Sequence, residues 1–142
     1  MKISQKSRHY VLFLTGIALV AFFIRLGVSF ELKDVYPAVS APAQATDNAT
    51  YLRLAESVTD GTYDYSKGFY YQPFYYTVFL PTIFKFFGKG CNGIIIVQSL
   101  LGAATVLLCG LTFASLYGKR CGIIAAIILA LARFHIFYSP FA

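Results

Sequence analysis

A chain of 142 residues that is 58% hydrophobic and only 13% charged cannot cover its apolar surface as a soluble domain of this size does. Its mean hydropathy of +0.65 and its long apolar runs predict an all-α integral membrane protein. The net charge of +6 does not indicate nucleic-acid binding, because the basic residues are scattered along the ends of the apolar runs and form no stripe among stacking side chains.

The first apolar run, residues 10–30, is long enough to cross about 30 Å of hydrocarbon as a helix. A cleavable signal peptide is the alternative, since residues 1–9 are basic. The run is longer than the roughly 7–15 apolar residues of such a peptide, and the small residues at 38–45 lie too far beyond it for normal cleavage. We therefore predict an uncleaved membrane helix preceded by a cytoplasmic N-terminus, residues 1–9.

A polar outer loop, residues 31–72, follows the first span. Within it Tyr51, Leu54, Ala55 and Val58 recur at helical spacing, which predicts an amphipathic helix over about 48–59, lying on the membrane surface. Many aromatic residues come next, and they fit either an interfacial belt or a wall on which a sugar stacks. They are Tyr63, Tyr65, Phe69, Tyr70, Tyr71, Phe74, Tyr75 and Tyr76.

Residues 73–142 are predicted to contain three more spans, which makes about four in all. The second span starts at Pro73 and should be kinked by Pro81, because proline donates no backbone hydrogen bond. The third covers residues 92–117 and the fourth residues 121–138. Small residues at four-residue spacing predict that the last two spans form a tight antiparallel hairpin. These residues are Gly110, Ala114, Gly118, Gly122, Ala126 and Ala130.

Alternation of four spans also predicts on which side of the membrane each loop lies. Lys85 and Lys89 would be cytoplasmic, like the N-terminus. Lys119 and Arg120 would be outside, against the preference of basic residues for the cytoplasm.

Asp47 precedes the predicted surface helix and admits two interpretations. As a helix N-cap it would contribute about 1 kcal/mol, a role that Thr46 could also take. As a functional group it would be a carboxylate held at the head of a rigid helix, one turn before Tyr51, whose hydroxyl could orient it. The two histidines, His9 and His135, are too isolated in sequence to be predicted as ligands.

The order of these features resembles the N-terminal part of the GT-C membrane glycosyltransferases. The resemblance rests on the first span, the Asp-x-x-x-Tyr motif at 47–51, the stretch "YYQPFYYTVFL" from residue 70, "FKFFG" from residue 84, and the "YGKR" turn at 117–120. The similarity is closest to the dolichyl-phosphate-mannose-protein mannosyltransferase and aminoarabinose-transferase families. Because such enzymes have many more spans, the resemblance implies a truncated GT-C transmembrane domain.

The resemblance implies an enzyme of the bacterial inner membrane. It would transfer a sugar from a polyprenyl-phosphate donor, with inversion, to a lipid, glycan or protein acceptor at the outer face. Asp47 matches the family's catalytic carboxylate, with a divalent metal ion at Asp47 as an option. The candidate substrate-binding residues are Tyr51, Arg53, Lys67, Tyr71 and Gln72. The alternative is a non-catalytic four-span membrane subunit or scaffold in which Asp47 only caps a helix.

Overall fold

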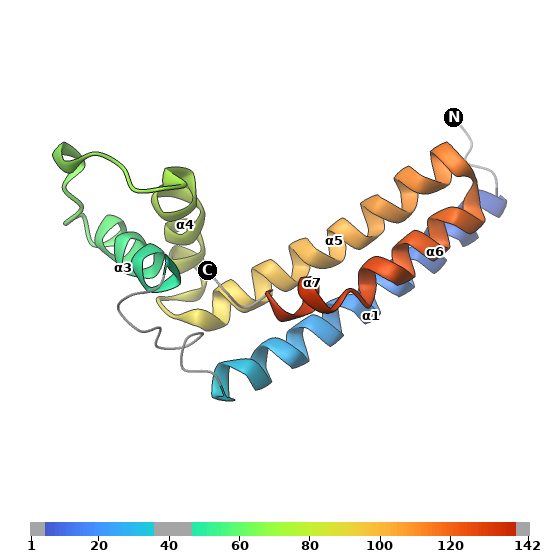
Figure 1. Cartoon of the computed structure of the whole chain (residues 1–142), viewed down its shortest axis with the longest axis horizontal. Helices are drawn as coiled ribbons and strands as arrows, with labels where there is room; N and C mark the ends of the chain where they lie inside the picture. The colour runs from blue at the N-terminus through green and yellow to red at the C-terminus, as the bar shows by residue number, and fades with distance from the viewer. Residues whose placement is uncertain (1–4, 36–46, 139–142) are drawn as a thin grey trace. The chain divides into compact units, whose positions relative to one another are not determined.

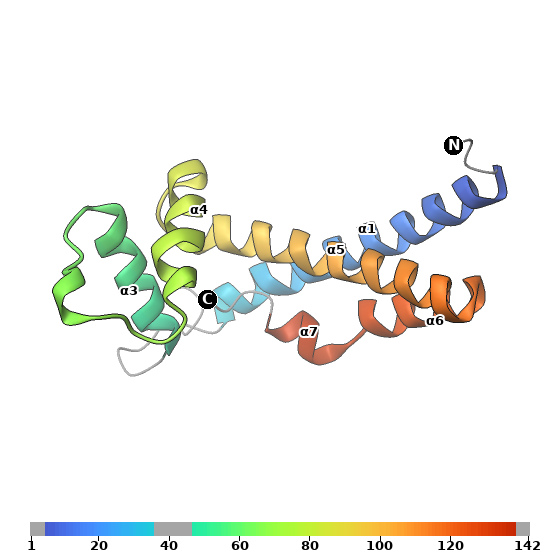
Figure 2. The same ribbon diagram turned by 90° about the horizontal axis from the view of Figure 1, so that it is seen from above.

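The computed structural model describes residues 5–35 and 47–138, and every regular element within these ranges is a helix. The chain divides into two compact units. One unit combines residues 5–29 with residues 98–138, and the other covers residues 30–35 and 47–97. The longest helices, α1 and α5, each begin in one unit and end in the other (Figures 1 and 2).

Within the described residues, two helices are long and apolar enough to cross a membrane. Helix α1 covers Gln5–Val35, and its apolar part, Arg8–Val35, has a mean hydropathy of 2.4. Helix α5 covers Cys91–Tyr117 with a mean hydropathy of 2.3. They correspond to the predicted first and third spans. The all-helical class is therefore confirmed for the described residues, whereas an architecture of four spans is not.

The predicted fourth span is divided into two shorter helices. Helix α6 covers Lys119–Ala130 and helix α7 covers Arg133–Phe137, and Ala132 between them has an extended backbone. The 12 residues of α6 rise only about 18 Å, well short of the hydrocarbon thickness of about 30 Å.

In the first unit, α5 and α6 approach each other closely through their small residues. A Cβ atom on Gly122 would collide with the backbone oxygen of Gly110 and would lie 2.7 Å from the Ala114 Cβ. A Cβ on Gly110 would lie 3.1 Å from both the Ala126 Cβ and a Leu14 methyl group of α1. The predicted tight hairpin is therefore present, and α1 packs against the same seam.

The predicted second span is also short. It consists of a π-helical turn, η2 (Tyr75–Phe79), followed by α4 (Leu80–Phe87), which ends at Gly88 with a φ of 79°. Since Pro81 cannot donate to a carbonyl one turn earlier, the chain widens into the π-helical turn ahead of it, where the sequence predicted a kink. From Tyr75 to Phe87 the rise is about 20 Å, so this segment is too short to be a straight span.

The second unit has a core built by α3 (Asp47–Thr59), η2, α4 and the start of α5. Helix α3 begins one residue before the predicted helix and buries Tyr51 and Ala55. These side chains pack against η2 and α4, and the cluster continues to α5. Its other buried members are Tyr76, Leu80, Ile83, Phe84 and Ile94. The apolar face of α3, which the sequence predicted to rest on a membrane surface, is therefore covered by protein.

Two polar contacts in this unit join residues that are distant in sequence. The Lys89 Nζ lies 2.6 Å from the Asp60 Oδ1, just beyond the end of α3, and the Lys33 Nζ donates to the Asn92 Oδ1 at 2.8 Å. Alternation of four spans predicted opposite sides of the membrane for the loop that contains Asp60 and for Lys89. The ion pair corrects that prediction, because paired residues must lie on the same side.

Candidate functional site

The carboxylate of Asp47 is held by a tyrosine, but not by the one that the sequence indicated. The Tyr70 hydroxyl donates to the Asp47 Oδ1 at 2.9 Å, and both side chains are at the surface. This hydrogen bond, followed by partial burial, raises the pKa of Tyr70 above its ordinary value. Asp47 itself lies in the first turn of α3, where the helix dipole favours a negative charge.

Tyr51 belongs to the aromatic core behind this pair. It is 8% exposed, its ring stacks on Tyr76 with centroids 6.1 Å apart, and the rings of Tyr70 and Tyr75 contact it edge-on at 5.7 Å each. Burial, followed by the nearby charge of Asp47, raises the pKa of Tyr51. Tyr51 thus supports the ring of Tyr70, and Tyr70 supplies the hydroxyl that meets Asp47.

Tyr76 fixes the backbone at Tyr70. Its buried hydroxyl accepts from the Tyr70 backbone N–H at 2.8 Å and lies 3.4 Å from the Tyr63 hydroxyl. The contact with Tyr76 raises the pKa of Tyr63 to about 12. The position of the Tyr70 hydroxyl is therefore determined by a buried group on η2, six residues further along the chain.

A cavity of about 440 Å³ opens beside Tyr70, within the range of small-molecule sites. Its walls combine aromatic faces with one cation and one carboxylate, Lys67 and Asp64. The full lining is Leu54, Ser57, Thr62, Tyr63, Asp64, Lys67, Gly68, Phe69 and Tyr70. Because Tyr70 lines the cavity and also binds Asp47, the catalytic candidate lies at the edge of an aromatic site.

A 3-10 turn, η1 (Tyr65–Lys67), shapes one wall of this cavity. Asp64 caps the turn by accepting from the Ser66 hydroxyl at 2.6 Å and from the Ser66 N–H at 3.1 Å, and these bonds lower the pKa of Asp64. Lys67 lies 3.5 Å from the same carboxylate, with its side chain 82% exposed. The Lys67 ammonium group is therefore exposed to solvent while it pairs with Asp64.

The other candidate substrate-binding residues, Arg53, Tyr71 and Gln72, are exposed. Arg53 is exposed on α3, and Tyr71 is 77% exposed with its ring 5.3 Å from that of Tyr70. Gln72 is exposed and has a φ of 52°, in the left-handed region that few non-glycine residues adopt. Its carbonyl accepts from the Tyr75 N–H at 2.9 Å, so it forms the turn that leads into η2.

The described residues around Asp47 do not form a set of ligands for a divalent metal ion. Among residues 5–35 and 47–138, no group of three or more His, Cys, Asp or Glu side chains is placed to hold a metal ion. The neighbour of Asp47 is a phenol, which is a poor match for the carboxylate-rich sites that hard divalent cations prefer.

The first unit contains a buried cation that the sequence analysis did not single out. Arg25 of α1 is 1% exposed, and it donates to the Ala21 carbonyl and to the Leu129 carbonyl at the end of α6, both at 3.2 Å. Gly102 makes room for it, since a Cβ there would lie 2.8 Å from the Arg25 Nε. A single charge inside an apolar run is the signal that could have identified it.

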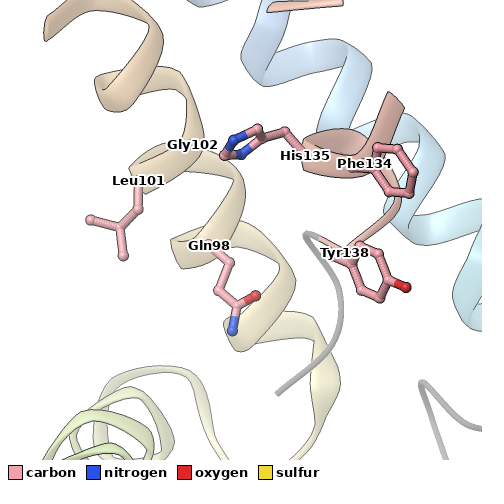
Figure 3. A pocket seen from close by; sticks show the side chains of 6 residues that line it. All are labelled: Gln98, Leu101, Gly102, Phe134, His135 and Tyr138. Carbon is pink, nitrogen blue, oxygen red and sulfur yellow. The ribbon is translucent and has the colours of Figure 1, made fainter. Parts of the chain in front are cut away.

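A second cavity of about 440 Å³ lies in the first unit between α5 and α7 (Figure 3). Its lining residues are Gln98, Leu101, Gly102, Phe134, His135 and Tyr138. The His135 ring extends from α7 towards Gly102 of α5, so this histidine is less isolated in space than in sequence (Figure 3). No carboxylate is among the lining residues, so acceptor activation is better suited to the site at Asp47.

Comparison of the chain with protein-family models, with curated proteins and with solved structures gave no match.

Proposed function

We propose that this chain is a glycosyltransferase, or part of one, in a bacterial inner membrane, and that Asp47 is its catalytic carboxylate. The donor would be a polyprenyl-phosphate sugar, and the acceptor a lipid, glycan or protein at the outer face. The observation that carries the proposal is the hydrogen bond from Tyr70 to Asp47 at the edge of an aromatic cavity. The resemblance to GT-C enzymes in the Asp-x-x-x-Tyr motif supports the same assignment.

The proposed chemistry follows from the side chains present. An acceptor hydroxyl is a weak nucleophile until a base removes its proton, and the Asp47 carboxylate can do so. The acceptor oxygen then bonds to the anomeric carbon while the bond from that carbon to the phosphate oxygen breaks, which inverts the configuration. Tyr70 holds the Asp47 Oδ1, so the Oδ2 is the oxygen directed at the acceptor.

The cavity beside Tyr70 suits the two other parts of the donor. A sugar ring presents C–H groups that stack on aromatic faces, and Tyr63, Phe69 and Tyr70 offer such faces. The leaving polyprenyl phosphate needs cationic stabilisation, which Lys67 at the cavity can supply, with Arg53 as the other cation nearby in sequence.

The scaffold alternative has its own support in the structure. The same hydrogen bond ties the start of α3 to the segment at Tyr70, and a bond that only fastens two segments together needs no chemistry. The glycosyltransferase needs the negative charge of Asp47 as a base, whereas the scaffold needs only an oxygen that accepts from the Tyr70 hydroxyl.

The deciding experiment compares Asp47→Asn with wild type in sugar transfer from a polyprenyl-phosphate donor. Asparagine keeps an oxygen that accepts from Tyr70, so the fold should be retained while the base is lost. We expect transfer to fall about 10²–10⁴-fold with unchanged thermal stability. Glu56→Gln, an exposed carboxylate on the same helix, is the matched control and should transfer at the wild-type rate. Equal rates for Asp47→Asn and wild type would leave Asp47 a structural residue.

A further inference from the structure

We propose that the segment from η2 to the end of α4, Tyr75–Phe87, does not cross the membrane but lies in its outer interface, in contact with anionic lipid headgroups. The inference depends on the membrane placement of α1 and α5 that belongs to the proposed function. It does not depend on sugar transfer.

Connectivity keeps α4 close to a membrane boundary. Only three residues, Gly88–Gly90, separate its end from Cys91, where the apolar helix α5 begins. At about 3.8 Å per residue, the Phe87 and Cys91 Cα atoms can be at most about 15 Å apart. Packing brings them nearer, because a Cβ on Gly93 would lie 2.5 Å from the Phe87 Cβ and 3.0 Å from an Ile83 methyl group.

An ion pair places Lys89, just beyond the end of this segment, at the level of the end of α3. The Lys89 Nζ lies 2.6 Å from one Asp60 oxygen and 2.7 Å from the other, and these residues flank the segment on either side in sequence. A span between them would separate them by about 30 Å. In both views α4 runs across the first turns of α5, not alongside them (Figures 1 and 2).

The outward side of this segment carries large exposed apolar side chains. Tyr76, Leu80, Ile83 and Phe84 face the protein core. On its other sides, Val78 is 47% exposed, Phe86 76% and Phe87 54%, beside the exposed Thr82 and Lys85. Such a group of exposed apolar side chains beside a membrane boundary fits burial by about 5–10 Å in the interface.

Charge favours anionic lipids as the partner. Residues 73–90 contain no Asp or Glu and two lysines, of which Lys89 pairs with Asp60, so Lys85 is the cation that can meet a lipid phosphate. Lys85 is exposed on α4 among the apolar side chains, so its ammonium group can reach phosphate groups while its stem lies on the acyl chains.

This placement also removes the conflict in the predicted sidedness. If residues 73–88 do not cross, α5 returns the chain to the cytoplasm, and Lys119 and Arg120 then lie on the side that basic residues prefer. The Lys119 Nζ lies 5.5 Å from the centre of the Tyr10 ring at the cytoplasmic end of α1, as this topology requires.

The chain contains no tryptophan, so single tryptophans report depth without background. The test places Val78→Trp, Phe86→Trp and Leu108→Trp separately in vesicles of phosphatidylcholine and phosphatidylglycerol, and measures quenching by lipids brominated at different depths. In the Leu108→Trp variant, where the native side chain of α5 is 63% exposed, we expect bromines near the bilayer centre to quench most. In Val78→Trp and Phe86→Trp, bromines near the headgroups should quench most, and more strongly as the phosphatidylglycerol fraction rises.

The results distinguish a wrong placement of the segment Tyr75–Phe87 from a wrong placement of α5 in the membrane. If the Val78→Trp variant reports the same depth as Leu108→Trp, the segment spans the membrane and the interfacial placement is overturned while that of α5 stands. If no bromine depth quenches the Leu108→Trp variant, the membrane placement itself fails and the inference with it.

A labelling experiment tests the same placement without added tryptophan. In a background where alanine replaces Cys91, Cys109 and Cys121, an impermeant thiol reagent should label Asp60→Cys and Lys89→Cys from the same side to a similar extent. Labelling from opposite sides would also overturn the proposal.

Discussion

Gly122→Ala should destabilise the contact between α5 and α6. The loss in packing should exceed the gain in helix propensity that alanine has over glycine. The new Cβ would meet the Gly110 backbone oxygen and the Tyr10 hydroxyl within van der Waals distance, and would lie 2.7 Å from the Ala114 Cβ. The Tyr10 hydroxyl can swing away, but a helix backbone cannot. The two helices must therefore move apart locally.

The size of the effect follows from this geometry. Ordinary carbon contacts lie at 3.4–4 Å, so the contact at 2.7 Å has to lengthen by about 1 Å. A gap of about 0.5–1 Å forfeits a quarter to a half of the attraction between facing atoms, and overpacking of this kind costs about 1–3 kcal/mol. Alanine stabilises a helix by about 0.5–1 kcal/mol relative to glycine. The measured change in the free energy of unfolding of Gly122→Ala contains this gain, so a control variant is needed to subtract it.

Gly27→Ala provides that correction. Gly27 lies inside α1, and a Cβ there has no atom within 4 Å, so this variant receives the propensity gain alone. Unfolding of both variants in detergent micelles by increasing sodium dodecyl sulfate, followed by helical circular dichroism, gives the two free energies. We expect Gly122→Ala to be less stable than Gly27→Ala by about 1–3 kcal/mol. A difference below about 0.5 kcal/mol would refute the close approach of α5 and α6 at this position.

Two further predictions concern Arg25 and Tyr63. Lysine at position 25 keeps the charge but cannot reach the Ala21 and Leu129 carbonyls together, so Arg25→Lys should cost about 1–3 kcal/mol in the same unfolding assay. An unchanged midpoint would mean that the guanidinium contacts contribute nothing. Tyr76→Phe removes the hydroxyl that raises the pKa of Tyr63 to about 12, so spectrophotometric titration should show this pKa moving down towards about 10. Because the folded pKa is raised, the associated stability is fully present below about pH 10 and is lost as the pH rises through about 12, and the variant should lose this alkaline dependence.

The two long helices were predictable because bilayer thickness imposes a length on any apolar helix that crosses it. Residues 10–30 and 92–117 satisfied that length, and α1 and α5 contain them. Helix α3 was predictable for a second local reason, the recurrence of Tyr51, Leu54, Ala55 and Val58 at helical spacing. The tight α5–α6 contact followed from small residues on both helices.

The second apolar run, predicted as a short span kinked at Pro81, is too short for a straight span, and the fourth was wrong as one continuous helix. Their composition is that of a span, but a π-helical turn and Pro81 interrupt one, and the extended Ala132 interrupts the other. Local sequence also could not show that Lys89 meets Asp60, since that contact joins residues 29 positions apart.

The sequence by itself determined the helical class and the two long apolar helices, because each depends on residues within a few turns of one another. Only the tertiary structure decided which side chain holds Asp47. Tyr70 lies 23 residues away and is one of many neighbouring aromatics, and its hydroxyl reaches Asp47 only because Tyr51 and Tyr76 fix its ring and backbone. The same holds for the covered face of α3: periodicity shows that a helix has an apolar side, but only packing shows whether lipid or protein buries it.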